Sequence, residues 1–164
     1  MKKVTRILNH PLFIRELKII NLLEENRAYC KHNLNHFFDV ARISYILLLE
    51  RNIRIDKEVL YAFALLHDIG RAREYLLKRD HQVESAILAG EILRDCGYSN
   101  DEIETVIYSI KNHRSSQVLK MHEIKTFVDI TRKADQLSRK CFCCECSDYC
   151  NWPEDKKNLE TITI

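Results

Sequence analysis

The chain contains few of the residues that break regular secondary structure. Its 164 residues include three glycines, two prolines and one tryptophan. A fold of many short β-strands needs frequent turn residues, so this scarcity argues against a β-sandwich or a β-barrel. Leu, Ile, Glu, Lys and Arg are common instead, and most of these residues favour helices. The sequence therefore predicts an all-α protein.

The chain also lacks a charge imbalance and a long apolar segment. Its 26 basic and 24 acidic residues give a formal net charge of +2, so charge alone does not support nucleic-acid binding or a membrane surface. Apolar runs such as Ile43–Leu49 are too short to cross a bilayer. No apolar core of signal-peptide length follows Lys2 and Lys3. We expect a cytoplasmic protein that does not associate with a membrane.

The length suits one compact domain, which would bury about 70% of the surface of the unfolded chain. The apolar periodicity predicts a bundle of about six helices, within residues 11–26, 35–49, 56–67, 80–96, 99–113 and 124–138. Asp56, Asp80 and Ser99 are good N-cap residues, and Gly70 and Gly97 are natural helix stops. We expect a helical domain over residues 1–140 and a cysteine-rich tail over 141–164, and the oligomeric state stays open.

The most apolar stretch, Val59–Gly70, runs directly into His67 and Asp68. A buried imidazole beside a buried carboxylate is unfavourable unless something compensates for the lost solvation. A bound metal ion would compensate, because neutral imidazole and ionised carboxylate are both good ligands. A His–Asp pair that satisfies itself at a helix end is the alternative reading of this dipeptide.

Further polar side chains fall on apolar helix faces in other predicted helices. Each could singly be a satisfied core residue, but together they place one imidazole or carboxylate on the buried side of each of four helices: His36, His81, His113 and Asp135. Helix bundles assemble ligand sets in this way. His32 precedes the clear part of the stripe and His10 precedes a proline, so we do not expect these two as ligands.

In this order and local context, the set resembles the HD-domain superfamily of metal-dependent phosphohydrolases, which is all-helical. The segment LLHDIG matches its signature, Val40-Ala41 follow His36 as in its first ligand helix, and Ser85-Ala86 follow His81. The run Lys133-Ala134-Asp135-Gln136-Leu137 is similar to its terminal motif. The resemblance covers roughly residues 30–140.

The resemblance implies that His36, His67, Asp68 and Asp135 coordinate a first metal ion. It also implies that His81 and His113 hold a second ion, with Asp68 bridging the two, in binuclear members. Imidazole and carboxylate ligands suit Fe, Mn, Ni or Zn rather than Ca²⁺. Such ions activate water and neutralise phosphoryl charge. The substrate would be a nucleotide or a related phosphomonoester or phosphodiester.

Arg71 follows the signature directly, where it could hold a phosphate of the substrate. Small bacterial members similar to symmetrical diadenosine tetraphosphate hydrolases share the pair His81 and His113. The nucleoside monophosphatase branch has an acidic residue where this chain has Arg71, which argues against that branch.

The tail departs from the ordinary family pattern. Five of the seven cysteines lie within ten residues, at Cys141, Cys143, Cys144, Cys146 and Cys150. The C-x-x-C spacings could hold zinc or an iron–sulfur cluster. Reduced, redox-sensitive thiols are the alternative.

Three hypotheses follow for the whole chain. The first is an active metal-dependent phosphohydrolase with one or two divalent ions, in which Asp68 and Arg71 have catalytic roles. The second is a nucleotide-sensing or regulatory module that keeps the metal and turns over little, with its tail as a redox or partner-binding element. The third is an interaction protein whose polar core residues satisfy one another.

Overall fold

The structure is a computed structural model that describes residues 1–114 and 122–159. The described residues form eight α-helices and no β-strand, which confirms the all-α prediction. In chain order the helices are α1 (Lys2–Leu8), α2 (Pro11–Leu23), α3 (Leu34–Glu50), α4 (Lys57–Leu66), α5 (Arg71–Leu77), α6 (His81–Asp95), α7 (Asn100–Asn112) and α8 (His122–Leu137). Three short 3₁₀ turns follow, η1 (Cys141–Cys143), η2 (Ser147–Tyr149) and η3 (Glu154–Lys156).

The capping residues explain where several helices begin. The Asp56 carboxylate accepts from the amide of Glu58 at the start of α4, and the Asp80 carboxylate accepts from two amides at the start of α6. Ser99 and Glu102 form a reciprocal capping box at the start of α7. These N-terminal boundaries are as the sequence predicts.

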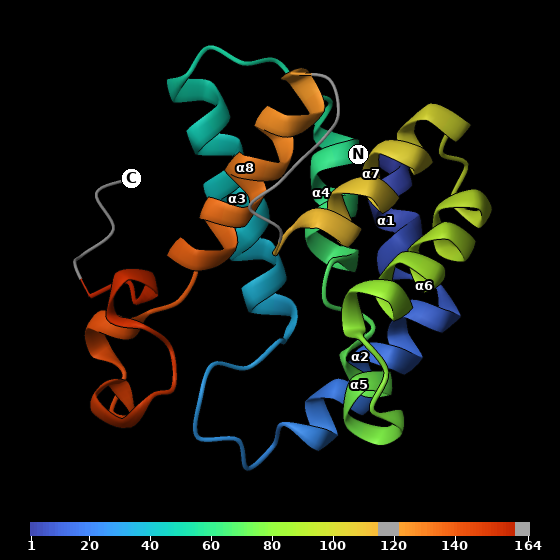
Figure 1. The fold of residues 1–164 in the computed structure, drawn as a ribbon. Helices are drawn as coiled ribbons and strands as arrows, with labels where there is room; N and C mark the ends of the chain where they lie inside the picture. The colour runs from blue at the N-terminus through green and yellow to red at the C-terminus, as the bar shows by residue number, and fades with distance from the viewer. Residues whose placement is uncertain (115–121, 160–164) are drawn as a thin grey trace.

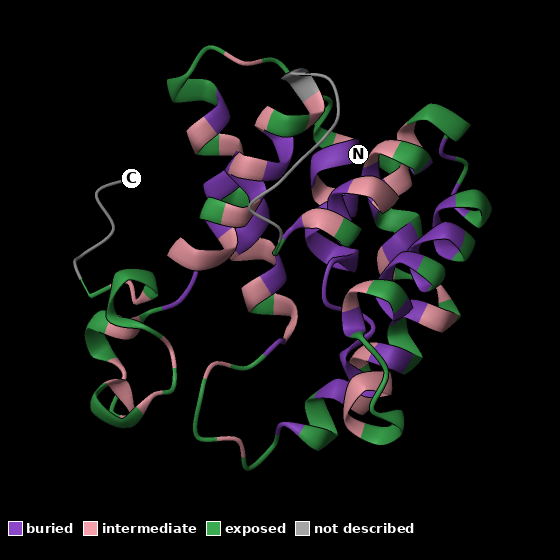
Figure 2. Cartoon of the chain, viewed as in Figure 1, coloured by how far each residue is buried: buried purple, intermediate pink, exposed green. Residues whose placement is uncertain are grey.

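Helix α4 lies at the centre of the core. Seven of its ten residues are buried, and it packs against α3 on one side and α7 on the other. Helix α8 lies along α3, and α6 lies along α7 (Figure 1). Figure 2 shows buried positions running along α4 and continuing into the turn that follows it. The apolar run found in the sequence is therefore the element around which the other helices pack.

The prediction of about six helices was too low by two short helices. Helix α1 buries Val4 and Ile7 against the core. Helix α5 occupies the basic segment between the predicted helices 56–67 and 80–96, and its first residues, Arg71 and Ala72, are buried. Among the described residues, no helix is both long and apolar enough to cross a membrane.

The two glycines predicted as helix stops have different roles. Gly97 follows α6 with a φ of 81°, a left-handed conformation that favours glycine. Gly70 has a φ of −79° and forms the N-cap of α5, so the prediction of a stop was wrong. A Cβ at Gly70 would lie 2.5 Å from the amide nitrogen of Ser85 and 2.6 Å from the carbonyl oxygen of His81. Glycine is needed there because the turn touches the backbone of α6.

Candidate metal centre

Two clusters of potential ligands lie at the buried ends of the helices. One consists of His36, His67 and Asp135, and the other of Asp68, His81 and His113, with the ligand atoms within 4.8 Å of one another in each. The adjacent residues His67 and Asp68 place the clusters side by side. The structure thus brings together all six residues that the sequence singled out as metal ligands.

Helix ends position these side chains. His36 follows the N-cap of α3, and Asp135 lies in the last turn of α8. His67 and His113 are the C-cap residues of α4 and α7, and His81 is the first residue of α6. The chain turns away after each cap, so residues from five helices converge without a break inside any of them.

The distances between the charged and imidazole groups are short. The Nε2 atom of His36 lies 3.4 Å from Oδ1 of Asp135, and Nε2 of His67 lies 3.5 Å from Oδ2 of Asp68. In the second cluster, Nε2 of His81 lies 3.4 Å from Oδ1 of Asp68. These separations suit ligands that share one ion.

Several of these atoms lack a hydrogen-bond partner although they are buried. Among the described residues, the buried atoms without a partner include Nε2 of His36, His67 and His81 and Oδ1 of Asp135. Leaving a buried polar group unpaired is unfavourable by about 1–3 kcal/mol. A cation bound between them would satisfy these atoms, so the donor set fits a metal ion.

The second nitrogen of each imidazole fixes the orientation of its ring. The Nδ1–H groups of His67 and His113 donate to the carbonyl oxygens of Ala64 and Ile110, at 2.8 and 2.6 Å. Nδ1 of His81 lies 2.9 Å from a Glu74 oxygen. A carbonyl or carboxylate at Nδ1 leaves the Nε2 lone pair free to bind a metal.

The surroundings favour the protonation states that metal ligation requires. Burial lowers the pKa of His36 to about 3 and that of His113 to about 4. Burial alone would raise the pKa of Asp68, but Arg71 and the nearby imidazoles hold it well below its usual value. The imidazoles of His36 and His113 are therefore neutral and the Asp68 carboxylate is ionised near neutral pH, as ligands must be.

Arginines surround the two clusters. Nε of Arg71 donates to Asp68 at 3.1 Å, and its Nη1 donates to Glu74 at 2.9 Å. Arg139 lies 3.6 Å from Oδ1 of Asp135. Arg114, which sequence reasoning missed, is exposed along much of its side chain, and partial burial of its guanidinium together with the nearby charge of Arg71 lowers its pKa. Its position directly after His113 was the available signal.

His32, which we did not expect as a ligand, belongs to neither cluster but lies beside them. This residue is buried, with 2% of its surface exposed, and its Nε2 lies 3.5 Å from Oδ2 of Asp68. Its Nδ1 and backbone amide both contact the carboxylate of Glu24, each at 2.6 Å. The spacing of four residues to His36 was a usable signal, but His32 lies in the loop before α3, where helical periodicity does not apply. His10 instead caps α2 through its ring and contacts Asp95.

The cysteines of the tail lie apart from the His/Asp clusters. All the cysteines are free thiols, and that of Cys143 is exposed and donates to the carbonyl oxygen of Lys140. The other tail cysteines are half-buried, as is Cys30 in the loop between α2 and α3. Cys30, Cys141 and Cys150 line one cavity of about 230 Å³.

Comparisons with known proteins agree on one family. The sequence pattern of the HD domain matches residues 33–140. A Clostridium beijerinckii protein described as uncharacterized is 38% identical over 160 residues, which cover 98% of each chain. The ribonuclease Y of Thermosipho melanesiensis is 33% identical over 100 residues, and the match covers 60% of this chain and 18% of that enzyme.

One solved structure supports the fold. The crystal structure of a predicted HD superfamily hydrolase from an uncultured Thermotogales bacterium aligns with a TM-score of 0.58. The alignment covers 94% of this chain and 87% of that one, at 22% sequence identity. At this identity the likeness shows the fold alone.

Proposed function

Because this chain belongs to the HD domain family, we propose that it is a metal-dependent phosphohydrolase acting on a nucleotide or a related phosphomonoester or phosphodiester. The observation that supports this most strongly is the pair of buried His/Asp clusters, whose unpaired ligand atoms face one another. An inert polar core would pair these atoms with one another or with the backbone.

Each part of the centre has a role in this proposal. His36, His67 and Asp135 would hold one divalent ion, and Asp68, His81 and His113 would hold a second, with Asp68 also close enough to His67 to be a ligand of the first. Bound Fe, Mn, Ni or Zn would supply Lewis acidity and lower the pKa of a coordinated water. Glu74 holds the ring of His81 in the orientation for ligation.

The arginines supply the contacts that a phosphorylated substrate needs. Arg71 is already within hydrogen-bond distance of Asp68, and Arg114 lies at the exposed edge of the same cluster. A guanidinium group can bind two phosphoryl oxygens at once. Arg71 and Arg114 would therefore orient the phosphoryl group while Asp68 and the imidazoles hold the ions.

The similarity to ribonuclease Y favours phosphodiesters as one substrate class to test. Since the chain spans only 18–26% of the length of these two enzymes, the substrate panel must include small molecules as well as RNA. We propose a small nucleotide as the substrate because a formal net charge of only +2 gives no support for a long polyanionic substrate.

The test is phosphate release by the purified protein with added Mn²⁺ or Fe²⁺. The panel contains mononucleotides, dinucleoside polyphosphates, a cyclic phosphodiester and a short RNA. We expect turnover on at least one small nucleotide, and Asp68→Ala should reduce it at least ~100-fold because the change removes a shared ligand.

The control is Asp129→Ala, which alters an exposed ion pair on α8 and leaves the centre intact. Its rate should equal that of the wild-type protein. Bound metal with no turnover on any substrate would favour a nucleotide-sensing module. A folded protein that binds no metal would refute both interpretations.

A further inference from the structure

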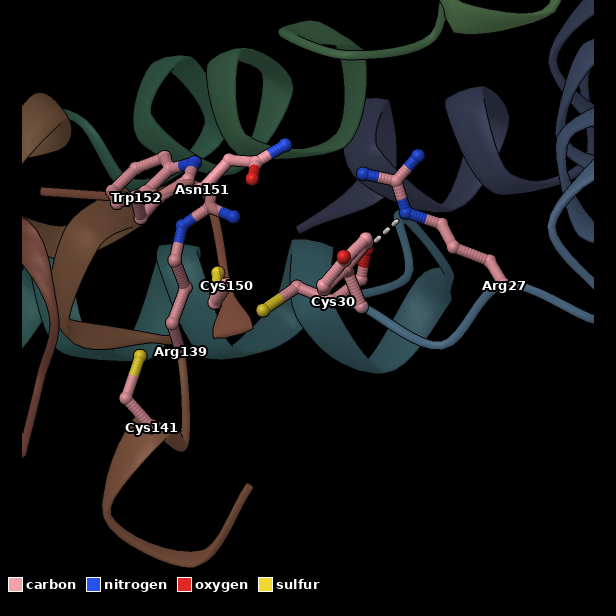
Figure 3. Close-up of a pocket in the computed structure, with 8 residues that line it drawn as sticks. Arg27, Cys30, Arg139, Cys141, Cys150, Asn151 and Trp152 are labelled. Atoms are coloured by element: carbon pink, nitrogen blue, oxygen red, sulfur yellow. Dashed lines mark hydrogen bonds between the residues drawn. The ribbon is translucent and has the colours of Figure 1, made fainter. Parts of the chain in front are cut away.

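The cavity beside the tail joins two distant parts of the sequence. Cys30 comes from the loop between α2 and α3, and Cys141 and Cys150 come from the segment after α8. Figure 3 shows the sulfur atom of Cys30 directed toward Cys150, with Cys141 on the far side of Arg139. Thiols from separate elements therefore face one space.

The backbone of the tail connects a further cysteine to Cys141 and Cys150. The amide of Cys144 donates to the carbonyl of Cys141, that of Ser147 to Cys144, and that of Cys150 to Ser147. These bonds link Cys141, Cys144 and Cys150 in one series through η1 and η2. Cys143 and Cys146 take no part in that series.

The tail needs a source of stability other than a hydrophobic core. No described residue between Cys141 and Leu159 is buried, although the segment forms three 3₁₀ turns. Small segments of this kind are commonly held by disulfides or by a structural metal. All the cysteines are free thiols in this structure.

We propose that Cys30, Cys141, Cys144 and Cys150 form a structural zinc site that fastens the tail to the loop before α3. Four cysteines are a standard ligand set for tetrahedral zinc. On binding, each thiol loses its proton to solvent as its sulfur forms a bond to Zn²⁺, so the site carries a net charge of −2. Arg27 and Arg139 line the same cavity and offset that charge.

The thiols also influence one another in the way that a shared site predicts. Cys30 and Cys144 both lie close enough to Cys141 for their thiolate charges to act on its thiol. Thiolates this close repel one another unless a cation lies between them. No three of the described cysteine sulfurs lie within 4.8 Å of one another, so ligation must draw the loop and the tail together.

The experiment uses the full chain with Co²⁺ in place of zinc. Thiolate ligation to Co²⁺ gives a sulfur-to-metal charge-transfer band. Co²⁺ bound at the His/Asp clusters would give no such band, because those clusters contain no thiolate. We expect the band in the wild-type protein, its displacement by one equivalent of Zn²⁺, and slower proteolysis of the tail when zinc is bound. Cys30→Ser should remove most of the band.

Two matched variants serve as controls. Cys143→Ser changes an exposed thiol of the same tail, and Cys96→Ser changes a buried thiol in the helical core. Both should keep the band. The proposal is overturned if the wild-type protein shows no band, if Cys30→Ser retains it in full, or if the isolated protein contains iron and acid-labile sulfide in the tail. Since the readout is thiolate ligation, it does not depend on phosphohydrolase activity.

Discussion

At the scale of single residues, the carboxylate of Glu24 joins three donors beside the metal centre. It accepts from the backbone amide of His32, from the ring of His32 and from the hydroxyl of Tyr75. Burial would raise the pKa of Glu24, but these contacts lower it to about 2. The ionised carboxylate fixes the His32 ring with Nε2 directed at Asp68.

Glu24→Gln tests this arrangement. The amide keeps the size of the side chain and removes the charge that holds His32, so we expect a loss of about 1–3 kcal/mol in the free energy of unfolding. Phosphate release should fall about 10–100-fold, as for other changes behind a metal centre. Urea unfolding and initial rates measure the two effects.

Glu25→Gln is the matched control, because Glu25 is the exposed neighbour. It should change neither quantity. If Glu24→Gln lowered stability and left the rate unaltered, the carboxylate would be a structural element with no influence on the centre.

The residue scale also shows what the sequence could predict. His36, His113 and Asp135 are recognisable because a helical period of 3.6 residues places them on apolar faces. His32 and Glu24 are not, because they lie in or beside an irregular loop and meet through a contact that no local pattern encodes. Arg114 could be suspected only from its position beside His113.

At the scale of elements, the turn between α4 and α5 determines how closely the two clusters approach. Gly70 touches the backbone of α6, and its amide donates to the hydroxyl oxygen of Ser85 at 2.8 Å. This contact holds the first turn of α6, with His81, next to Asp68. A side chain at this position would separate the two elements.

Gly70→Ala should therefore destabilise the protein by about 1–3 kcal/mol, because backbone atoms must move to admit the Cβ. It should also weaken metal binding by displacing His81. Gly90→Ala is the comparison, since the nearest atom to its Cβ is the flexible side-chain end of Ile107 at 3.3 Å. We expect Gly90→Ala to be at least as stable as the wild type, because alanine is more favourable than glycine in a helix interior by about 1 kcal/mol.

Urea denaturation measures the stability of both glycine variants, and metal titration measures their affinity for the ion. Equal stability and equal metal affinity for Gly70→Ala would show that the approach of α5 to α6 does not position the centre.

The elements themselves were predictable to different degrees. The starts of α4, α6 and α7 follow from local capping chemistry, which the sequence displays directly. Helix α5 was missed because it is short and rich in basic residues, which is typical of a solvent-exposed segment between helices. Its burial depends on ion pairs of Arg73 with Glu84 and Glu16, which join it to α6 and α2. Such pairing between elements cannot be read from local periodicity.

At the scale of the whole molecule, the metal centre gathers residues from α3, α4, α6, α7 and α8 and the turn after α4. An ion bound there would connect most of the bundle, and it would bind only the folded chain. Ligand binding at about 100 times the dissociation constant stabilises the folded state by about 2.7 kcal/mol. Removing the metal should therefore lower the unfolding temperature of the whole domain.

We expect a chelator to lower Tm by roughly 5–10 °C, since each kcal/mol corresponds to about 2–4 °C for a domain of this size. Adding Mn²⁺ or Fe²⁺ back should restore it. The measurement is best made on Cys30→Ser, so that a metal site in the tail cannot contribute. Asp68→Asn in that background should show little response to the chelator, because the shared ligand is lost. A full response in the double variant would place the stabilising ion somewhere other than between the two His/Asp clusters.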